Sequence, residues 1–430
     1  MACVIKNGHL IDPANDISKK ADVFISDEGF IQGIGKAPAK FEIKSEIDAS
    51  GQIVCPGLVD LRARPREPGL EYKATIESET LAAVSAGITT FCCPPDTQPV
   101  IDTPAMAQMI QHRAWRFGMS FIHPMGALTK NLEGKLLSDM EALDEAGCVG
   151  LTNSHIPITN TLVLRRAMEY AATFDLTVFL HSEDPWLHGD GCVHEGEVGT
   201  RLGLPGIPEA AETVGIARDL ALIEHTGVRA HFCGLSSARA VEMIAEAQSR
   251  GFNVSADVTA HHLHLTEHDI GDYNTQCHVM PPLRSERDRA ALQQSIKSGV
   301  VTAICSDHQP HEPDAKLAPF AVAAPGISGL ETLLPLTLKL VASKLLSMEQ
   351  AIALLTTNPA NIIGVDTGNL GIGATADICI FDPKQHWILT AENFVSHGQN
   401  SPFIGWEFTG KVTHTFVGGE LVFTQSENKI

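Results

Sequence analysis

Short apolar runs rich in β-branched residues alternate along most of the chain with longer segments whose apolar residues recur every three or four positions. The short runs are typical of buried strands, and the longer spacing is typical of amphipathic helices. Repeated alternation of the two favours an α/β fold, a (β/α)8 barrel of the TIM type, over an open doubly wound sheet. The eight candidate strands are IVCPGLVDLRAR, GITTFCCP, MSFIHPMGAL, CVGLTN, LTVFLHSED, VRAHFCGLS, FNVSADVTAHHL and VVTAICSDHQPH.

The two ends of the chain have a different pattern. Residues 1–52 and 365–430 carry short alternating strands, such as ADVFISDEGFIQGIG and KVTHTFVGGELVF, with turn residues between them. Strict alternation over a few residues is typical of half-buried strands. We therefore expect the two ends to pair into one small β-sandwich beside a barrel formed by residues 53–364.

Composition narrows the range of partners and compartments. The 430 residues include 31 Lys+Arg and 51 Asp+Glu, which gives a formal net charge of −20. Such a surface repels nucleic acid and anionic lipid, so neither is expected as a partner. Ten cysteines without a CxxC pair, no signal-peptide pattern and no apolar run of membrane-spanning length predict a cytoplasmic protein with reduced thiols.

Several candidate strands are apolar at first and polar at their C-terminal ends, where barrels of this type keep their chemistry. Motifs run in order along nearly the whole chain: VCPGLVDLRARPREPG, PPDTQPV, FLHSED, EGEVGTRLGLPGIPEAAE, VTAHHLHLTE, MPPLRSERDR, SDHQPH, GISGLET, TTNPANIIG, GATADICIFDP and SPFIGWEF. With these motifs the chain resembles the amidohydrolase superfamily and, within it, the longer dihydroorotases of multifunctional complexes. The resemblance implies an amidohydrolase barrel with one or two zinc ions at its mouth.

The resemblance also implies where the metal ligands should stand. Family members have two histidines at the end of the first strand, a carboxylate or modified lysine after the fourth, histidines after the fifth and sixth, and an aspartate after the eighth. The matching positions in this chain are Arg62, Arg64, Asn153, His181, Gly234 and Asp307. Of these, His181 and Asp307 keep the expected residue type, so the resemblance predicts a degenerate metal site.

Two arginines stand where the paired histidines would be. Arginine offers no lone pair and stays protonated in proteins, and residues i and i+2 of a strand face the same way. Arg62 and Arg64 thus remove ligands and add positive charge, so we predict no zinc, no other cofactor and no catalytic group beyond the remnant Asp307. The loss of a zinc-bound water forfeits a pKa lowering of roughly 8 to 9 units, on the order of 12 kcal/mol of nucleophile activation.

Without zinc, Asp307 would be a partly buried carboxylate that lacks a counter-ion, which is costly. We expect Arg62 or Arg64 to fill the vacated volume and to pair with Asp307 in place of the metal. The alternative is that both arginines turn out into solvent at the barrel rim.

The positions that match the family's substrate pocket are mixed. Arg66 corresponds to the arginine that binds the substrate carboxylate, and His311 corresponds to a substrate-contacting histidine. Asp96 stands where an asparagine is expected and would repel an anionic substrate, and Met280 replaces another asparagine. The pocket therefore no longer matches a dihydroorotate site, although weak binding of another small molecule is compatible with it.

Further histidines could suggest a metal centre. The three in TAHHLHLTE have metal-like spacing, but family members keep similar histidines there without using them as ligands, so packed or hydrogen-bonded roles are expected. His155 and His231 could join His181 and Asp307 in an improvised zinc site, an alternative that the neighbouring arginines oppose.

The resemblance points to a function in pyrimidine biosynthesis. Several bacteria carry a non-catalytic dihydroorotase-like chain that associates with aspartate carbamoyltransferase, and this chain has the same combination of complete fold and missing ligands. We predict a pseudoenzyme that acts as a structural or assembly subunit for the aspartate carbamoyltransferase catalytic chain, in a homo- or hetero-oligomer. Two alternatives stay open: an active zinc-dependent cyclic-amide hydrolase with a non-standard metal site, and a small-molecule sensor that kept the pocket.

Overall fold

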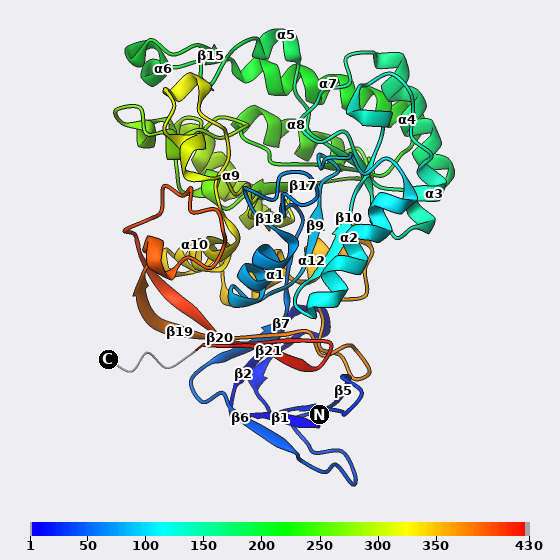
Figure 1. Ribbon diagram of the computed structural model, residues 1–430, viewed down its shortest axis with the longest axis vertical. Helices are drawn as coiled ribbons and strands as arrows, with labels where there is room; N and C mark the ends of the chain where they lie inside the picture. Colours follow the sequence, from blue (N-terminus) through cyan, green and yellow to red (C-terminus); the bar gives the residue numbers. More distant parts are fainter. Residues whose placement is uncertain (1, 426–430) are drawn as a thin grey trace.

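The computed structural model describes residues 2–425, which form a barrel and a β-sandwich (Figure 1). In Figure 1 the sandwich lies at the bottom and contains both β1 (Cys3–Lys6) and β21 (Glu420–Thr424), while the barrel and its helices fill the upper part. Among the described residues, no helix combines the length and the apolar character needed to cross a membrane.

The barrel wall is built from parallel strands that follow one another in sequence order. Every predicted barrel strand contains one of them, and β10 continues through Met125 into β11. The strands are β8 (Leu58–Asp60), β9 (Ile88–Cys93), β10 (Phe121–Pro124), β11 (Gly126–Ala127), β12 (Leu151–Thr152), β13 (Val178–Leu180), β16 (Ala230–Phe232), β17 (Val254–Thr259) and β18 (Ala303–Cys305). The ring closes where Ala63 forms a parallel bridge with His308. This closure sets the residues that follow β8 directly beside those that follow β18.

Helices connect the strands and cover the outside of the barrel (Figure 1). Their ends follow from local sequence: α1 begins at a capping box of Thr75 and Ser78, and α7 ends at Gly227, whose φ of 69° suits glycine. The outer helices are α1 (Ile76–Ser85), α2 (Pro104–Phe117), α3 (Met140–Glu145), α4 (Thr161–Thr173), α7 (Glu209–Thr226), α8 (Ala238–Ser249), α9 (Glu286–Ser298), α10 (Leu330–Ala342), α11 (Met348–Leu355) and α12 (Thr357–Ile363).

An insertion after β13 adds short elements above the barrel, at the top of Figure 1. Its elements are α5 (Pro185–His188), β14 (Val193–His194), α6 (Glu197–Leu202) and β15 (Gly206–Ile207). Because it follows the C-terminal end of a barrel strand, it lies on the side where barrels of this type carry their functional groups.

The two ends of the chain pair in the sandwich, as the alternating patterns predict. One sheet has the strand order β21-β20-β19-β7-β2-β3 and the other β5-β4-β1-β6, and apolar side chains such as Ile5, Val54 and Ile378 pack between them. The remaining strands are β2 (His9–Asp12), β3 (Ile17–Lys20), β4 (Val23–Ile25), β5 (Ile31–Ile34), β6 (Ser45–Asp48), β7 (Ile53–Pro56), β19 (Ile378–Ile388) and β20 (Glu407–Val417). β7 pairs with β19 in this sandwich, with Cys55 opposite Cys379. The first barrel strand is therefore β8, which begins at Leu58, a few residues beyond the start predicted at residue 53.

Candidate functional site

The two arginines that follow β8 point into the barrel mouth and share one carboxylate. Each has 3% of its surface exposed. The Nε atom of Arg62 donates to Oδ1 of Asp307 at 2.7 Å, and Nη1 of Arg64 donates to the same oxygen at 3.0 Å. The structure thus contains the ion pair predicted from the sequence, with both arginines engaged instead of one, and neither turns out to solvent.

Asp307 lies just beyond β18 with a φ of 44°, and its second oxygen, Oδ2, accepts a hydrogen bond from Nε2 of Gln309 at 3.1 Å. Burial alone would raise the pKa of Asp307. The guanidinium groups of Arg62 and Arg64 outweigh burial and hold that pKa well below its ordinary value. Asp307 is therefore a fixed anion at neutral pH and a very weak base.

The rest of the Arg62 guanidinium is also held. Its Nη1 lies 3.3 Å from Nε2 of His181, and its Nη2 lies 3.6 Å from Sγ of Cys305 and 3.8 Å from Oδ1 of Asp257. Desolvation, the neighbouring His155 and Arg62 together lower the pKa of His181 well below its ordinary value. His181 is therefore neutral, and its Nε2 can accept a hydrogen bond from Arg62.

Arg64 has two further partners besides Asp307. Its Nε donates to Oδ2 of Asp96 at 2.7 Å, and its Nη2 donates to Oγ of Ser154 at 3.3 Å. Desolvation disfavours the charged form of Asp96, but Arg64 outweighs it and lowers the pKa of Asp96. The carboxylate that the sequence suggested would repel a substrate thus serves as the counter-ion of Arg64.

The other two degenerate metal positions contribute no ligand. The Asn153 side chain is held between its own loop and the segment after β11: it accepts from Oγ1 of Thr129 at 2.7 Å and donates to the carbonyl oxygens of Leu132 and Ile156 at 3.1 and 2.8 Å. Gly234 has a φ of +61°, and a Cβ atom added there would lie 2.9 Å from Nη2 of Arg62.

The substrate-pocket positions split into separate places. Arg66 donates from Nε to the carbonyl oxygen of Pro310 at 3.0 Å, and its Nη2 lies 3.2 Å from Nε2 of His311. Desolvation and the nearby Arg64 lower the pKa of Arg66 to about 10, and desolvation together with Arg66 lowers the pKa of His311 to about 3. Met280 lies elsewhere, in the wall of a cavity beside the ends of β13 and β16.

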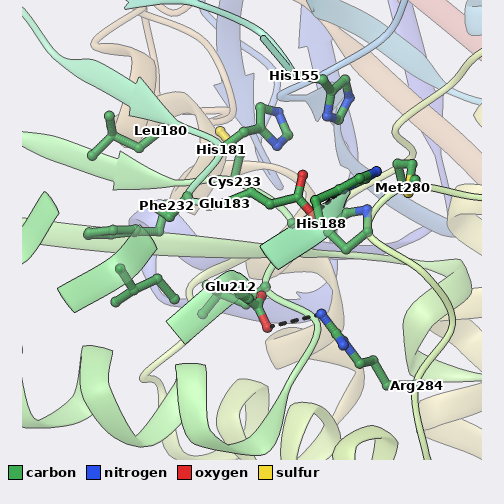
Figure 2. Close-up of a pocket in the computed structure, with 15 residues that line it drawn as sticks. His155, Leu180, His181, Glu183, His188, Glu212, Phe232, Cys233, Met280 and Arg284 are labelled. Atoms are coloured by element: carbon green, nitrogen blue, oxygen red, sulfur yellow. Dashed lines mark hydrogen bonds and ion pairs between the residues drawn. The ribbon is translucent and has the colours of Figure 1, made fainter. Parts of the chain in front are cut away.

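Figure 2 shows this cavity, which has a volume of about 100 Å³. The rings of His155 and His181 lie at one side with their centroids 4.0 Å apart. Nδ1 of His188 lies 2.8 Å from Oε1 of Glu183, in a pair at the same opening. Desolvation and Arg64 lower the pKa of His155 to about 4, so the imidazole of His155, like that of His181, is neutral, whereas the hydrogen bond with Glu183 raises the pKa of His188.

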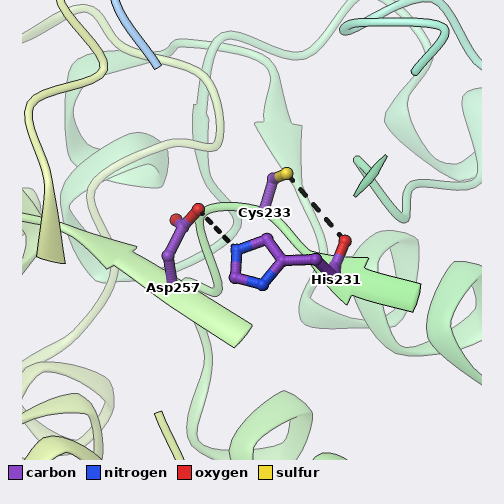
Figure 3. Close-up of side chains that lie close together, drawn as sticks. All are labelled: His231, Cys233 and Asp257. Atoms are coloured by element: carbon purple, nitrogen blue, oxygen red, sulfur yellow. Dashed lines mark hydrogen bonds and ion pairs between the residues drawn. The ribbon is translucent and has the colours of Figure 1, made fainter. Parts of the chain in front are cut away.

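A second group of potential metal ligands comprises His231, Cys233 and Asp257 (Figure 3). Its donor atoms already have partners: Nδ1 of His231 lies 2.8 Å from Oγ of Ser255, and its Nε2 lies 3.0 Å from Oδ2 of Asp257. Oδ1 of Asp257 accepts from the amide of Gly234 at 2.7 Å. Burial raises the pKa of the Cys233 thiol, so the thiolate that a metal requires is disfavoured. Contacts with Ser255 and Asp257 hold the His231 ring against β17.

Of the three histidines in the TAHHLHLTE motif, His262 and His264 are hydrogen-bonded and His261 is packed. Nδ1 of His262 lies 2.6 Å from Oγ1 of Thr259, and Nε2 of His264 lies 2.9 Å from the carbonyl oxygen of Leu336. His261 is buried with its ring 4.7 Å from that of His262. These contacts agree with the packed and hydrogen-bonded roles expected from the sequence.

Sequence reasoning missed two contributors to the site. Asp257 is the charged residue in the middle of the mostly buried strand β17, and that position was a usable signal, because a buried carboxylate needs a partner. Ser154 has a φ of 54° in the loop after β12, and nothing in the sequence pattern indicates that its hydroxyl meets Arg64.

These residues do not fit a zinc ion. Zinc takes lone pairs from imidazole, thiolate or carboxylate groups. Oδ1 of Asp307 already accepts from two guanidinium groups, and Nε2 of His181 faces Nη1 of Arg62. The arginines put two fixed positive charges in the same volume, and such charges oppose a divalent cation.

Comparison with known proteins places this geometry in a family. A family model described as "Dihydro-orotase-like" matches residues 51–240, and one described as "Amidohydrolase family" matches residues 222–423. A "Dihydroorotase-like protein" of Pseudomonas aeruginosa is 48% identical over 98% of this chain and 99% of its own length. A "Dihydroorotase" of Geobacter sp. (strain M21) is 40% identical over 98% of this chain and 99% of its own.

Solved structures share the whole architecture. The L-hydantoinase (dihydropyrimidinase) from Arthrobacter aurescens superposes with a TM-score of 0.88 at 25% identity and covers 99% of this chain and 96% of its own. A D-hydantoinase superposes with a TM-score of 0.82 at 21% identity, with 99% and 95% covered. The molecule is thus an amidohydrolase-type (β/α)8 barrel with a β-sandwich, as predicted. Within that class, the chain belongs to the dihydroorotase-like amidohydrolase family.

Proposed function

We propose that this chain is a catalytically inactive dihydroorotase homologue that acts in pyrimidine biosynthesis as an assembly subunit for aspartate carbamoyltransferase. The proposal of catalytic inactivity rests on one observation, the shared carboxylate: Oδ1 of Asp307 accepts hydrogen bonds from Arg62 and Arg64 at 2.7 and 3.0 Å. A relative that hydrolyses a cyclic amide with zinc needs that carboxylate and the volume around it for a metal-activated water.

Neither Asp307 nor His155, which lie beside the arginines, replaces the missing activation. Water without a metal keeps a pKa of about 15.7, against about 7 on zinc. A general base works best with a pKa near the working pH. The pKa of Asp307 lies far below that range, and the pKa of His155 is lowered to about 4 by desolvation and Arg64. Without a metal, neither Asp307 nor His155 therefore offers an efficient route to a hydroxide nucleophile.

The second half of the proposal rests on the resemblance and on the intact fold. The barrel and sandwich superpose on catalytic hydantoinases over nearly the whole chain, so the shape is kept although the metal positions have changed. A fold retained without its chemistry can be selected through its surface, in contacts with a partner chain. The relative in Pseudomonas aeruginosa is called dihydroorotase-like, a name compatible with such a role.

Purified full-length chain tests the catalytic half directly. We expect substoichiometric zinc by elemental analysis and no dihydroorotate hydrolysis above the blank. Stoichiometric zinc together with turnover would instead establish an active hydrolase with a non-standard metal site. The variant Asp307→Asn is the control for a contaminating hydrolase, because a contaminant's activity would survive the substitution.

Co-expression with the aspartate carbamoyltransferase catalytic chain of the same organism tests the assembly half. We expect the two chains to elute as one complex, and carbamoyltransferase activity to fall when this chain is withdrawn. Separate elution with unchanged carbamoyltransferase activity would refute the assembly role. Saturable binding of a small molecule in place of both results would favour a sensor that uses the cavity of Figure 2.

A further inference from the structure

We infer that the changes at the former metal positions are co-adapted in two pairs, Arg62 with Gly234 and Arg64 with Asp96, so that the barrel mouth is a rebuilt ion-pair site. This goes beyond the proposed function, because it concerns how the site is constructed and holds whether or not the chain binds a carbamoyltransferase. It follows from the misfit between these residues and zinc.

The first pair is a matter of space. The Arg62 guanidinium is planar and is held at two edges, by Nε on Asp307 and by Nη1 near His181, so the position of Nη2 is fixed. A Cβ atom at position 234 would lie 2.9 Å from that Nη2, closer than the 3.5–4.0 Å typical of favourable non-bonded contacts. The missing side chain at Gly234 therefore makes the room that Arg62 occupies. The histidine that the family resemblance places there would meet the guanidinium.

The second pair is a matter of charge. Two guanidinium groups share Oδ1 of Asp307, and that single anion cannot neutralise both. Arg62 has a second carboxylate, Asp257, 3.8 Å away, and Arg64 has Asp96 at 2.7 Å. The asparagine expected from the family at position 96 would leave Arg64 with only a share of Asp307. The aspartate at position 96 therefore matches the arginine at position 64.

The ion pairs form an array that connects strand ends across the barrel mouth and comprises Arg62, Arg64, Asp96, Asp257 and Asp307. Its members follow β8, β9, β17 and β18 or lie within them, and Ser154 adds the loop after β12 through Nη2 of Arg64. Metal ligands in a relative would draw on several of the same strand ends. The guanidinium groups thus connect strand ends that are far apart in sequence. Gly234, which leaves room for Arg62, and Asp96, which neutralises Arg64, make that connection possible.

Double-mutant cycles on the full chain, read by equilibrium urea unfolding, test the charge pair. The cycle comprises Asp96→Asn, Arg64→Met and their combination. We expect Asp96→Asn to lower the unfolding midpoint in the wild-type background and to have a much smaller effect once Arg64 is Met. The exposed pair Arg166 and Glu169, bonded at 2.7 Å on α4, is the matched control, and Arg166→Met with Glu169→Gln should combine additively.

A second cycle tests the space pair. Gly234→Ala should lower the midpoint strongly in the wild type and much less when Arg62 is replaced by Met. Backbone strain at the positive φ is common to both backgrounds and therefore cancels in the cycle. Gly203, with a φ of +66° and nothing within 4 Å of an added Cβ, measures that strain alone through Gly203→Ala.

If Arg62→Met does not fold, Arg62→Lys provides a second background in which to measure the effect of Gly234→Ala. Arg62→Lys keeps the charge but lacks the branch that carries Nη2, so Gly234→Ala should cost less in that background than in the wild type. Additivity in both cycles, within the error found for the control pair, would overturn the inference. That result would leave the proposed function untouched, because it tests neither metal content nor association with a carbamoyltransferase.

Discussion

Replacing Asp307 by asparagine keeps the shape of the side chain and removes the negative charge that two buried guanidinium groups share. In the wild type, Oδ1 accepts two charge-assisted hydrogen bonds, at 2.7 Å from Arg62 and at 3.0 Å from Arg64. Hydrogen bonds to charged groups contribute about 1.5–3 kcal/mol each, against about 0.5–1.5 kcal/mol for neutral ones. Removing one partner of a buried ion pair costs about 3–5 kcal/mol.

We therefore expect Asp307→Asn to lower the free energy of unfolding by about 3 kcal/mol. The asparagine oxygen can still accept hydrogen bonds from the charged guanidinium groups, and Asp96 and Asp257 still offset part of the positive charge, so the lower end of the range applies. Such a loss is a large share of the 5–15 kcal/mol typical of folded proteins, so urea unfolding measures it well. Asp175→Asn is the control, because Asp175 is 88% exposed and a surface pair contributes about 0–1 kcal/mol.

The pH dependence gives a second readout of the same substitution. Because the pKa of Asp307 is lower in the folded chain than in the unfolded chain, its stabilisation is present above about pH 4 and is lost as the pH falls further. Asp307→Asn should lack that part of the acid sensitivity. If it unfolds at the same urea concentration as Asp175→Asn and keeps the wild-type pH profile, Asp307 is a catalytic remnant with no structural role, and the reasoning about the ion pair is wrong.

Two further predictions concern Glu331, which is partly buried, and Lys316, which is buried; both lie away from the array. Burial raises the pKa of Glu331 to about 7, although its carboxylate accepts from the amides of Val395 and Ser396 at 3.0 Å. Because the folded chain then binds a proton that the unfolded chain releases, stability should fall as the pH rises from about 4.3 to about 7. Urea unfolding of Glu331→Gln should lack this pH dependence. Burial lowers the pKa of Lys316 to about 8, where its ammonium meets only carbonyl oxygens among the described residues. Stability should therefore rise between about pH 8 and 10.4 in the wild type relative to Lys316→Met, and equal profiles would refute this.

Much of the fold could be predicted because its signals are local. The barrel strands are short apolar runs between helical segments, and each run contains an observed strand. The sandwich strands alternate, and their pairing across the chain ends followed from the similarity of the two patterns. The limit of this reasoning is β7: its sequence is as apolar as a barrel strand, and its pairing with β19 and β2 in the structure is what shows that it belongs to the sandwich.

The site was predictable where strand geometry decides it. Arg62 and Arg64 face the same way at the end of one strand, and ring closure brings Asp307 beside them, so a pairing followed from topology and charge. The partner of Asp96 and the reason for Gly234 were out of reach. Both depend on the direction of a long flexible side chain across a gap between residues far apart in sequence, and periodicity carries no such information.

A guanidinium and a zinc ion can supply positive charge at the same place, but they differ in how the charge depends on the surroundings. A bound metal stabilises a fold by mass action, so the stability it provides falls when the metal is removed. The charge of Arg62 and Arg64 is covalently attached and always present. The chain's stability should therefore be independent of metal supply, and dialysis against a chelator should leave the urea midpoint unchanged. A fall in the midpoint that added zinc reverses would show that a metal contributes to the fold after all, and the ion-pair account of the barrel mouth would be wrong.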